Sequence, residues 1–302
     1  MTYADDSAPA IELAGGPVSW GVDFAGDPGN PPYEDVLSGI AGAGLRWIEL
    51  GPVGYLPPRR AALQPHGLRS AAGFVFEPLH DPAARTTVLR AARLALAAIA
   101  ATGGRFLVVI DRPGAERAPT AGRPVAAERL DAARRAHLAA AVRAIAELAG
   151  AHGVRAVFHP HAGSFVEFED EIERLLADVG ADVLGLCLDT GHALYAGADP
   201  AALVARHADR LEHLHVKDVS APRLAAAHAD GLDFWAAVAQ GVFCPVGDGG
   251  LDLAALRGAL SAAGYAGLAT VEQDRRPGSP GRPEDDLRRS VRRLRAAGIG
   301  AQ

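Results

Sequence analysis

The chain has 302 residues, of which 49% are hydrophobic and 22% charged, and its formal net charge is -6 at pH 7. This length can bury a large core and suits either two small domains or one α/β barrel. Proteins that bind nucleic acid or anionic membranes usually carry an excess of basic residues. This chain has a net negative charge, so we expect neither as a partner. A small-molecule substrate is the expected partner.

The chain has two cysteines, Cys187 and Cys244, which indicate neither a disulfide framework nor a cysteine zinc site. The sequence does not open with a basic segment followed by an apolar run, and charged residues interrupt the alanine-rich helices before they could span a bilayer. We therefore expect a cytoplasmic protein outside the membrane. Whether it is a monomer or a homo-oligomer stays open.

Two hydrophobic periodicities alternate along the chain. Short apolar runs predict strands at residues 18–24, 47–51, 68–76, 105–111, 155–161, 183–189, 211–218 and 267–274. Amphipathic stretches predict helices at residues 33–43, 82–102, 126–150, 168–178, 199–209, 252–263 and 284–297, with one or two turns near 60–64. Eight β-then-α units predict a single (β/α)8 TIM barrel over residues 15–302. Residues 1–14 are expected to form a flexible tail, and loops 112–123 and 275–282 are long enough to act as lids.

Groups that bind metals or carry protons follow the last four predicted strands. His159 and His161 end the fifth strand, and Asp189, His215 and Glu272 end the sixth, seventh and eighth. The carboxyl ends of parallel barrel strands surround the active site, so these side chains should converge. We expect Asp189, His215 and Glu272 to bind a metal ion. The competing interpretation is a buried ion pair that only orders loops.

The two histidines of the fifth strand are two residues apart, so both leave the same face. We expect His159 to be a metal ligand; the alternative is that His159 packs in the barrel while His161 binds substrate. Imidazoles and carboxylates without a thiolate suit one divalent ion, Mn²⁺ or Co²⁺ first, with Mg²⁺, Fe²⁺ and Zn²⁺ as alternatives. Such an ion can chelate an α-hydroxyketone and assist removal of the neighbouring proton.

Other polar and aromatic residues near the strand ends are weaker candidates. Glu49 would face the pocket or hold a loop, and Trp20 and Tyr55 would form an apolar wall against a polyol ring or cap the barrel. His80 follows the third strand, and His192 would order its loop or touch the substrate. The candidate substrate-binding residues are Trp20, Glu49, Tyr55, His80, His161, His192 and Lys217.

These segments resemble the xylose-isomerase-like sugar phosphate isomerase/epimerase superfamily. The Asp-Thr-Gly-His sequence at 189–192 and the His-x-Lys-Asp sequence at 215–218 are superfamily marks. The doubled histidine, and Gly-Val-Phe at 241–243 followed by Pro-Val-Gly-Asp-Gly at 245–249, resemble more narrowly the inosose dehydratases, which remove water from 2-keto-myo-inositol. Together with 48–57 and 272–274, the resemblance runs over most of the chain.

The resemblance implies a metal-dependent dehydratase of a cyclic polyol ketone. Ketose 3-epimerases of this superfamily are expected to carry a glutamate where His159 stands, so only Glu272 remains of their pair. Epimerisation needs two proton-transfer groups at one carbon, whereas elimination needs one base and one acid. Glu272 is the first candidate base, and Lys217 and His161 are candidates to protonate or hydrogen-bond the leaving oxygen.

Other activities stay open as alternatives. Members of this superfamily also isomerise or epimerise ketoses and cleave oxidised C-glycosides by elimination. Abasic-site endonucleases share the barrel, but they need a richer set of zinc ligands and a basic face, which this acidic chain lacks.

Overall fold

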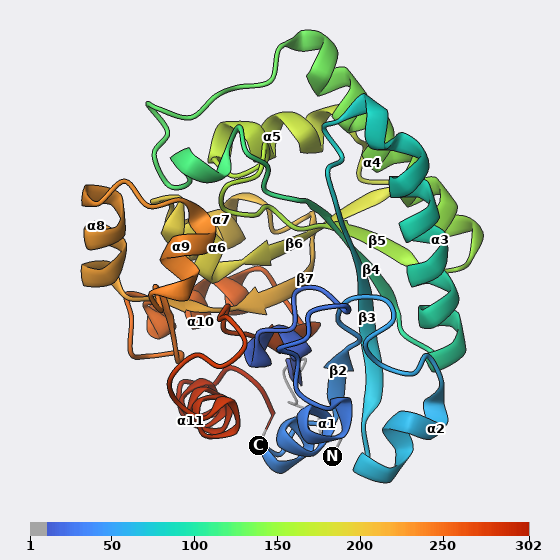
Figure 1. Cartoon of the computed structure of the whole chain (residues 1–302), viewed down its shortest axis with the longest axis vertical. Helices are drawn as coiled ribbons and strands as arrows, with labels where there is room; N and C mark the ends of the chain where they lie inside the picture. The colour runs from blue at the N-terminus through green and yellow to red at the C-terminus, as the bar shows by residue number, and fades with distance from the viewer. Residues whose placement is uncertain (1–10, 302) are drawn as a thin grey trace, which may run out of the picture.

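The computed structural model describes residues 11–301 and forms a closed barrel of eight parallel strands surrounded by helices (Figure 1). The barrel strands are β1 (Glu12–Gly15), β2 (Trp47–Glu49), β3 (Arg69–Glu77), β4 (Phe106–Asp111), β5 (Arg155–Phe158), β6 (Leu184–Asp189), β7 (Leu211–Val216) and β10 (Leu268–Val271). They are neighbours in the order β1-β10-β7-β6-β5-β4-β3-β2. The predicted (β/α)8 barrel is confirmed.

The helices mostly follow the predicted alternation. They are α1 (Tyr33–Gly42), α2 (Arg60–Leu63), α3 (Arg85–Thr102), α4 (Ala132–Ala151), α5 (Glu169–Asp178), α6 (Thr190–Tyr195), α7 (Pro200–Arg206), α8 (Ala221–Ala229), α9 (Phe234–Ala239), α10 (Leu253–Ala262) and α11 (Pro283–Ala296). The periodicity missed α6, α8 and α9, of which α6 and α9 are only six residues long. None of the described helices is long and apolar enough to cross a bilayer.

The core lies between the strands and the apolar faces of the helices. On α3, Val88, Leu96 and Ile99 are buried against the barrel. A Cβ added to Gly73 of β3 would lie 3.0 Å from Ile99 Cγ1, so this glycine lets α3 approach the sheet closely. Burying one such aliphatic side chain contributes about 1.5–3 kcal/mol. The helices thereby hold the strands and the groups at their ends.

The first strand is not where the sequence predicts it. The strand expected at residues 18–24 is replaced by the short 3-10 helix η1 (Pro17–Trp20) and a loop, and the barrel is completed by Glu12–Gly15. Part of the expected tail is therefore barrel strand, while residues 1–10 lie outside the described residues. Proline has no N–H to donate and a fixed φ, so the chain turns at Pro17.

An excursion after β7 covers the carboxyl end of the barrel. It contains α8 and α9, which project at one side of the barrel in Figure 1, and a small antiparallel pair of β8 (Asp218–Val219) and β9 (Phe243–Cys244). The Asp218 carboxylate accepts backbone N–H groups of Val219, Gly247, Gly249 and Leu251 at 2.8–3.0 Å. Asp218 therefore holds the loop after β9.

Buried charge anchors the long loop after β4. The Arg117 guanidinium is buried and donates to Glu171 Oε1 at 2.7 Å and to Glu167 Oε2 at 3.1 Å, and Gly122 N–H donates to Glu167 Oε1 at 2.6 Å. Removing one partner of such a buried pair costs about 3–5 kcal/mol. The loop is therefore fixed at its centre. A lid function for residues 275–282 stays a prediction.

Candidate active site

Four predicted metal-binding side chains meet at the carboxyl end of the barrel. The Nε2 atom of His159 lies 3.2 Å from Asp189 Oδ2, which lies 3.7 Å from His215 Nδ1. His215 Nδ1 in turn lies 3.1 Å from Glu272 Oε2. All four side chains are buried. Asp189 and His215 face each other in the register of β6 and β7, so strand pairing itself brings them together.

The local structure directs one Asp189 oxygen into this cluster. Asp189 is the last residue of β6 and the N-cap of α6, and its Oδ1 accepts the N–H groups of Gly191 and His192 at 2.8 and 2.9 Å. Such a cap satisfies donors that the first turn of a helix leaves unpaired. Oδ2 is left to face the imidazoles.

The donor set fits a divalent metal ion. Ligand atoms of His159, Asp189 and His215 all lie within 4.8 Å of one another. His215 Nδ1 is buried and has no hydrogen-bond partner among the described residues, although the Asp189 and Glu272 carboxylates lie close to it. Two imidazoles and two carboxylates suit a first-row divalent ion.

A buried carboxylate, that of Glu49, orients His215 through Nε2, the ring nitrogen that does not face Asp189 and Glu272. Glu49 Oε1 lies 2.8 Å from His215 Nε2 and 2.7 Å from His213 Nε2, and it accepts the Thr270 hydroxyl at 2.7 Å. Burial would raise the pKa of Glu49, but His215 and His213 hold the pKa well below its usual range. As a carboxylate it accepts the Nε2 proton of His215. Burial would lower the pKa of His215, but Cys187, Glu49 and Glu272 raise it well above its usual value, so a metal ion bound at Nδ1 would replace a proton there. These contacts give Glu49 an orienting role. Glu49 also lines the cavity described below, so its contact with substrate stays a prediction.

His213 was missed from the sequence. Its side chain is buried beneath the metal-binding cluster. The signal that could have found it is its spacing from His215, since residues two apart on a strand face the same way.

Lys217 is held by three carboxylates. Its Nζ lies 2.8 Å from Asp274 Oδ1, 3.2 Å from Asp189 Oδ2 and 3.3 Å from Glu272 Oε2. Burial would lower the pKa of Lys217, but these carboxylates raise the pKa well above its usual value, so the side chain is an ammonium ion. Burial raises the pKa of Asp274 to about 6 against the opposing effect of Lys217.

His161 and His192 are neutral neighbours. Their ring centroids are 3.9 Å apart, and burial lowers the pKa of both well below the usual value. His161 Nδ1 lies 2.9 Å from the carbonyl oxygen of Ala162, which can only accept, so Nδ1 carries the proton. His161 Nε2 is therefore the nitrogen with a lone pair. His161 lines the cavity described next, whereas His192 lies behind it.

These groups form one side of a cavity of about 60 Å³. The apolar part of the lining consists of Val18, Val22, Phe74, Phe76, Ile110, Phe234, Trp235 and Val238. The ring of Phe76 lies 6.4 Å from that of Trp235 and 5.5 Å from that of His161. An apolar wall beside a few polar groups is typical of a site for a small organic molecule.

Besides His192, three more candidate substrate-binding residues lie outside this lining. Trp20 Nε1 donates to Glu284 Oε1 of α11 at 3.2 Å, and the Tyr55 hydroxyl donates to the carbonyl of Pro31 at 2.9 Å. His80 Nδ1 lies 2.7 Å from Asp111 Oδ1. The apolar wall expected at Trp20 and Tyr55 is instead formed by Phe76 and Trp235, because η1 replaces the predicted first strand and turns Trp20 outward.

Asp23, in the loop after η1, also lines the cavity and was not singled out in the sequence. Burial, assisted by the charge of Asp274, raises the pKa of Asp23 to about 7. Its Oδ2 lies 4.0 Å from Arg276 Nη1 of the 275–282 loop. Sequence pattern offered no signal for it, since the segment was interpreted as a strand.

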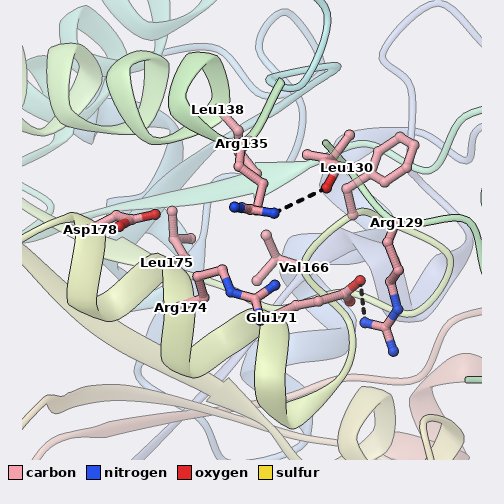
Figure 2. Close-up of a pocket in the computed structure, with 10 residues that line it drawn as sticks. Arg129, Leu130, Arg135, Leu138, Val166, Glu171, Arg174, Leu175 and Asp178 are labelled. Carbon is pink, nitrogen blue, oxygen red and sulfur yellow. Dashed lines mark hydrogen bonds and ion pairs between the residues drawn. The ribbon is translucent and has the colours of Figure 1, made fainter. Parts of the chain in front are cut away.

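A smaller cavity of about 30 Å³ lies outside the barrel between α4 and α5. Figure 2 shows Glu171 facing Arg129 there, and their ion pair is 2.6 Å long. Arg135 donates to the carbonyl of Leu130 at 3.4 Å. These contacts fasten the chain before α4 to α5, and the Glu171 carboxylate there is taken up by its ion pair with Arg129.

Comparison with known proteins gives relatives over nearly the whole chain. Residues 40–297 match the family described as Xylose isomerase-like TIM barrel. The rhizopine catabolism protein MocC of Rhizobium meliloti is 33% identical over 285 residues, covering 91% of this chain and 85% of that protein. The inosose dehydratase of Geobacillus kaustophilus is 31% identical over 269 residues, covering 86% of each.

Solved structures share the fold. The probable 3-DHS dehydratase AsbF from Bacillus anthracis aligns with a TM-score of 0.71 at 14% identity, covering 94% of this chain and 99% of that one. The D-allulose 3-epimerase from Methylomonas sp. aligns with a TM-score of 0.69 at 19% identity, covering 96% and 98%. At these identities the likeness concerns the fold alone.

Proposed function

Because this chain belongs to the xylose isomerase-like TIM barrel family, we propose that it is a metal-dependent dehydratase of a cyclic polyol ketone such as 2-keto-myo-inositol. Its similarity to an inosose dehydratase supports this choice of reaction. The observation that carries the proposal is the 3.3 Å distance between Lys217 Nζ and Glu272 Oε2, which sets a proton donor beside a proton acceptor in one cavity. Elimination of water needs such a pair.

The metal would be held by His159, Asp189, His215 and Glu272, and Mn²⁺ or Co²⁺ suits these ligands. When bound, a divalent ion polarises the substrate carbonyl and makes the neighbouring C–H bond more acidic. Glu49 supports this arrangement because it keeps the Nε2 proton of His215 on the side away from the cluster.

We assign the proton transfers to Glu272 and Lys217. Glu272 takes the proton from the carbon next to the ketone, and the C–H electrons form an enolate. As the carbonyl re-forms, a double bond forms to the next carbon and the C–O bond there breaks. The hydroxyl leaves as water with a proton from Lys217. Lys217 Nζ lies 3.3 Å from Glu272 Oε2, so the proton that Glu272 has taken can then pass to Lys217. This transfer restores the carboxylate and the ammonium ion for the next turnover.

His161 is assigned to substrate binding. The lone pair on its Nε2 fits an acceptor for a substrate hydroxyl, so its tautomer supports binding rather than protonation of the leaving group. Phe76 and Trp235 would lie against the C–H face of the ring.

The test is incubation of metal-loaded protein with 2-keto-myo-inositol in deuterated water. Absorbance of the conjugated product and NMR should show loss of water, and Lys217→Met should lower kcat by about 10²-fold or more, the range for loss of one acid or base. Lys217→Arg, which keeps the charge, is the matched variant and should retain metal binding.

The alternatives predict different products. An epimerase would incorporate deuterium into a ketose without releasing water, and a C-glycoside lyase would release an aglycone from an oxidised glycoside. Either result, with the inosose unchanged, would replace the proposal.

A further inference from the structure

The amino ends of the strands carry a second cavity, at the end of the barrel opposite the active site. This hollow of about 470 Å³ is bounded by α2, by the starts of β3 and β4 and by the end of α3. Helix α2 lies at the lower right of Figure 1. Its volume is within the range of about 300–1,000 Å³ typical of small-molecule sites.

Three arginines, Arg60, Arg69 and Arg105, line the hollow. The lining contains no aspartate or glutamate, and among residues 11–301 none of the three forms an ion pair. Elsewhere at this end of the barrel, Arg155 is paired with Glu212 at 2.5 Å. The feature of this hollow is therefore that three cationic side chains gather on a lining without a carboxylate, in a chain of net charge -6.

Two of these arginines flank one aromatic ring. The guanidinium carbons of Arg69 and Arg105 lie 5.7 and 5.4 Å from the centre of the Trp47 ring. Cation–π contact holds the two arginine side chains at the hollow. Because they are already ordered, a ligand that binds them costs less conformational entropy. Trp47 also provides a local fluorescent reporter.

An unpartnered hydroxyl belongs to a residue that lines the hollow. Ser70 lines the hollow, is only 2% exposed, and its Oγ has no hydrogen-bond partner among the described residues. Thr102, on the same lining, does bond its hydroxyl to the Ala98 carbonyl at 2.8 Å. A buried hydroxyl left unpaired is unfavourable, so a ligand group that reaches it and pairs it is favoured.

We propose that this hollow binds a phosphate group, either as free phosphate or on a small phosphorylated molecule. Guanidinium groups bind phosphate oxygens through paired, charge-assisted hydrogen bonds, and a hydroxyl donor such as that of Ser70 complements them. The hollow is separate from the proposed catalytic groups, so the proposal does not depend on the dehydratase activity.

The experiment is titration of the full-length protein with inorganic phosphate and with glucose 6-phosphate, at constant ionic strength. The calorimetric heat and the intrinsic tryptophan fluorescence, to which Trp47 contributes, should both saturate. Arg69→Gln with Arg105→Gln should weaken binding by about tenfold or more, and Ser70→Ala by roughly threefold. Tighter binding of glucose 6-phosphate identifies a phosphorylated metabolite as the source, and equal binding identifies the free ion.

The controls separate a site from general charge effects. Arg93→Gln changes an exposed arginine of α3 outside the hollow and should bind phosphate as the parent does. Arg60→Gln, on the exposed side of α2, is a second test if the double variant does not fold. Equal phosphate binding by the parent, Arg60→Gln and the double variant, or a response that chloride reproduces, would overturn the proposal.

Discussion

Glu49 Oε1 lies 2.8 Å from His215 Nε2, while Glu272 Oε2 lies 3.1 Å from the Nδ1 atom of the same imidazole. The carboxylates of Glu49 and Glu272 thus lie beside different nitrogens of the His215 ring. When a metal ion displaces the proton at Nδ1, the ring keeps one proton, and Glu49 holds that proton at Nε2.

Glu49→Gln should weaken metal binding while preserving side-chain volume. The amide is a poorer acceptor than the carboxylate, and loss of such an orienting partner typically costs about 10–100-fold in metal affinity. Competition with a chelator measures the change. Glu147→Gln, on the exposed side of α4, is the control and should match the parent. Equal affinity in Glu49→Gln and the parent would show that Glu49 does not orient His215.

Asp189→Ala and His215→Ala should each lose the metal ion. The parent is expected to hold about one divalent ion per chain, at the ligand atoms of His159, Asp189 and His215 with Glu272 beside them. Metal analysis after gel filtration checks the content, and circular dichroism checks that the variants fold. Full occupancy in both variants would remove these residues from the ligand set.

The two histidines after β5 should separate metal binding from turnover. His159→Ala should lower metal affinity, because His159 Nε2 lies 3.2 Å from Asp189 Oδ2. His161→Ala should keep the metal and lower kcat/KM, because His161 lines the cavity without belonging to that cluster. Metal titration and steady-state kinetics on both variants provide the comparison. Bound metal liganded by His161 instead of His159 would reverse the assignment.

His159→Glu should bring back a second carboxylate near the substrate. We expect retained metal, weakened dehydration and a trace of epimerised ketose, since epimerisation requires a second proton-transfer group at the same carbon. NMR in deuterated water distinguishes the two products. Undiminished dehydration would mean that this position does not influence the reaction.

Asp23→Asn should change the pH dependence of stability. The pKa of Asp23 is raised by burial from 3.8 to about 7, so its contribution to folding is complete below pH 3.8 and is lost as the pH rises through about 7. Asparagine lacks the ionisation. The variant should therefore exceed the parent in stability at pH 8, by about 2 kcal/mol once residual solvent contact is allowed for, and match it near pH 4.

Urea unfolding at both pH values measures this difference. Asp209→Asn, at an exposed position after α7, is the control and should leave the difference between the two pH values unchanged. An Asp23→Asn curve parallel to that of the parent at all pH values would contradict the role assigned to burial.

The sequence by itself determined the alternation of strands and helices and placed His159, Asp189, His215 and Glu272 at strand ends. Both properties are local, because hydrophobic periodicity reports which face of a segment is buried. Seven of the eight barrel strands were found in this way. The first was missed because Glu12–Gly15 is four residues long and ends in glycine, whereas the apolar run after it lines the cavity.

Only the tertiary structure decided what each of these groups does. Glu49 binds His213 and His215 across more than 160 positions of sequence, and Lys217 meets carboxylates from two other strand ends. Trp235 reaches the cavity from α9, in a segment for which the sequence predicted neither a helix nor a strand. Such contacts follow from barrel closure and from the paths of loops, which depend on long-range packing that no local period encodes.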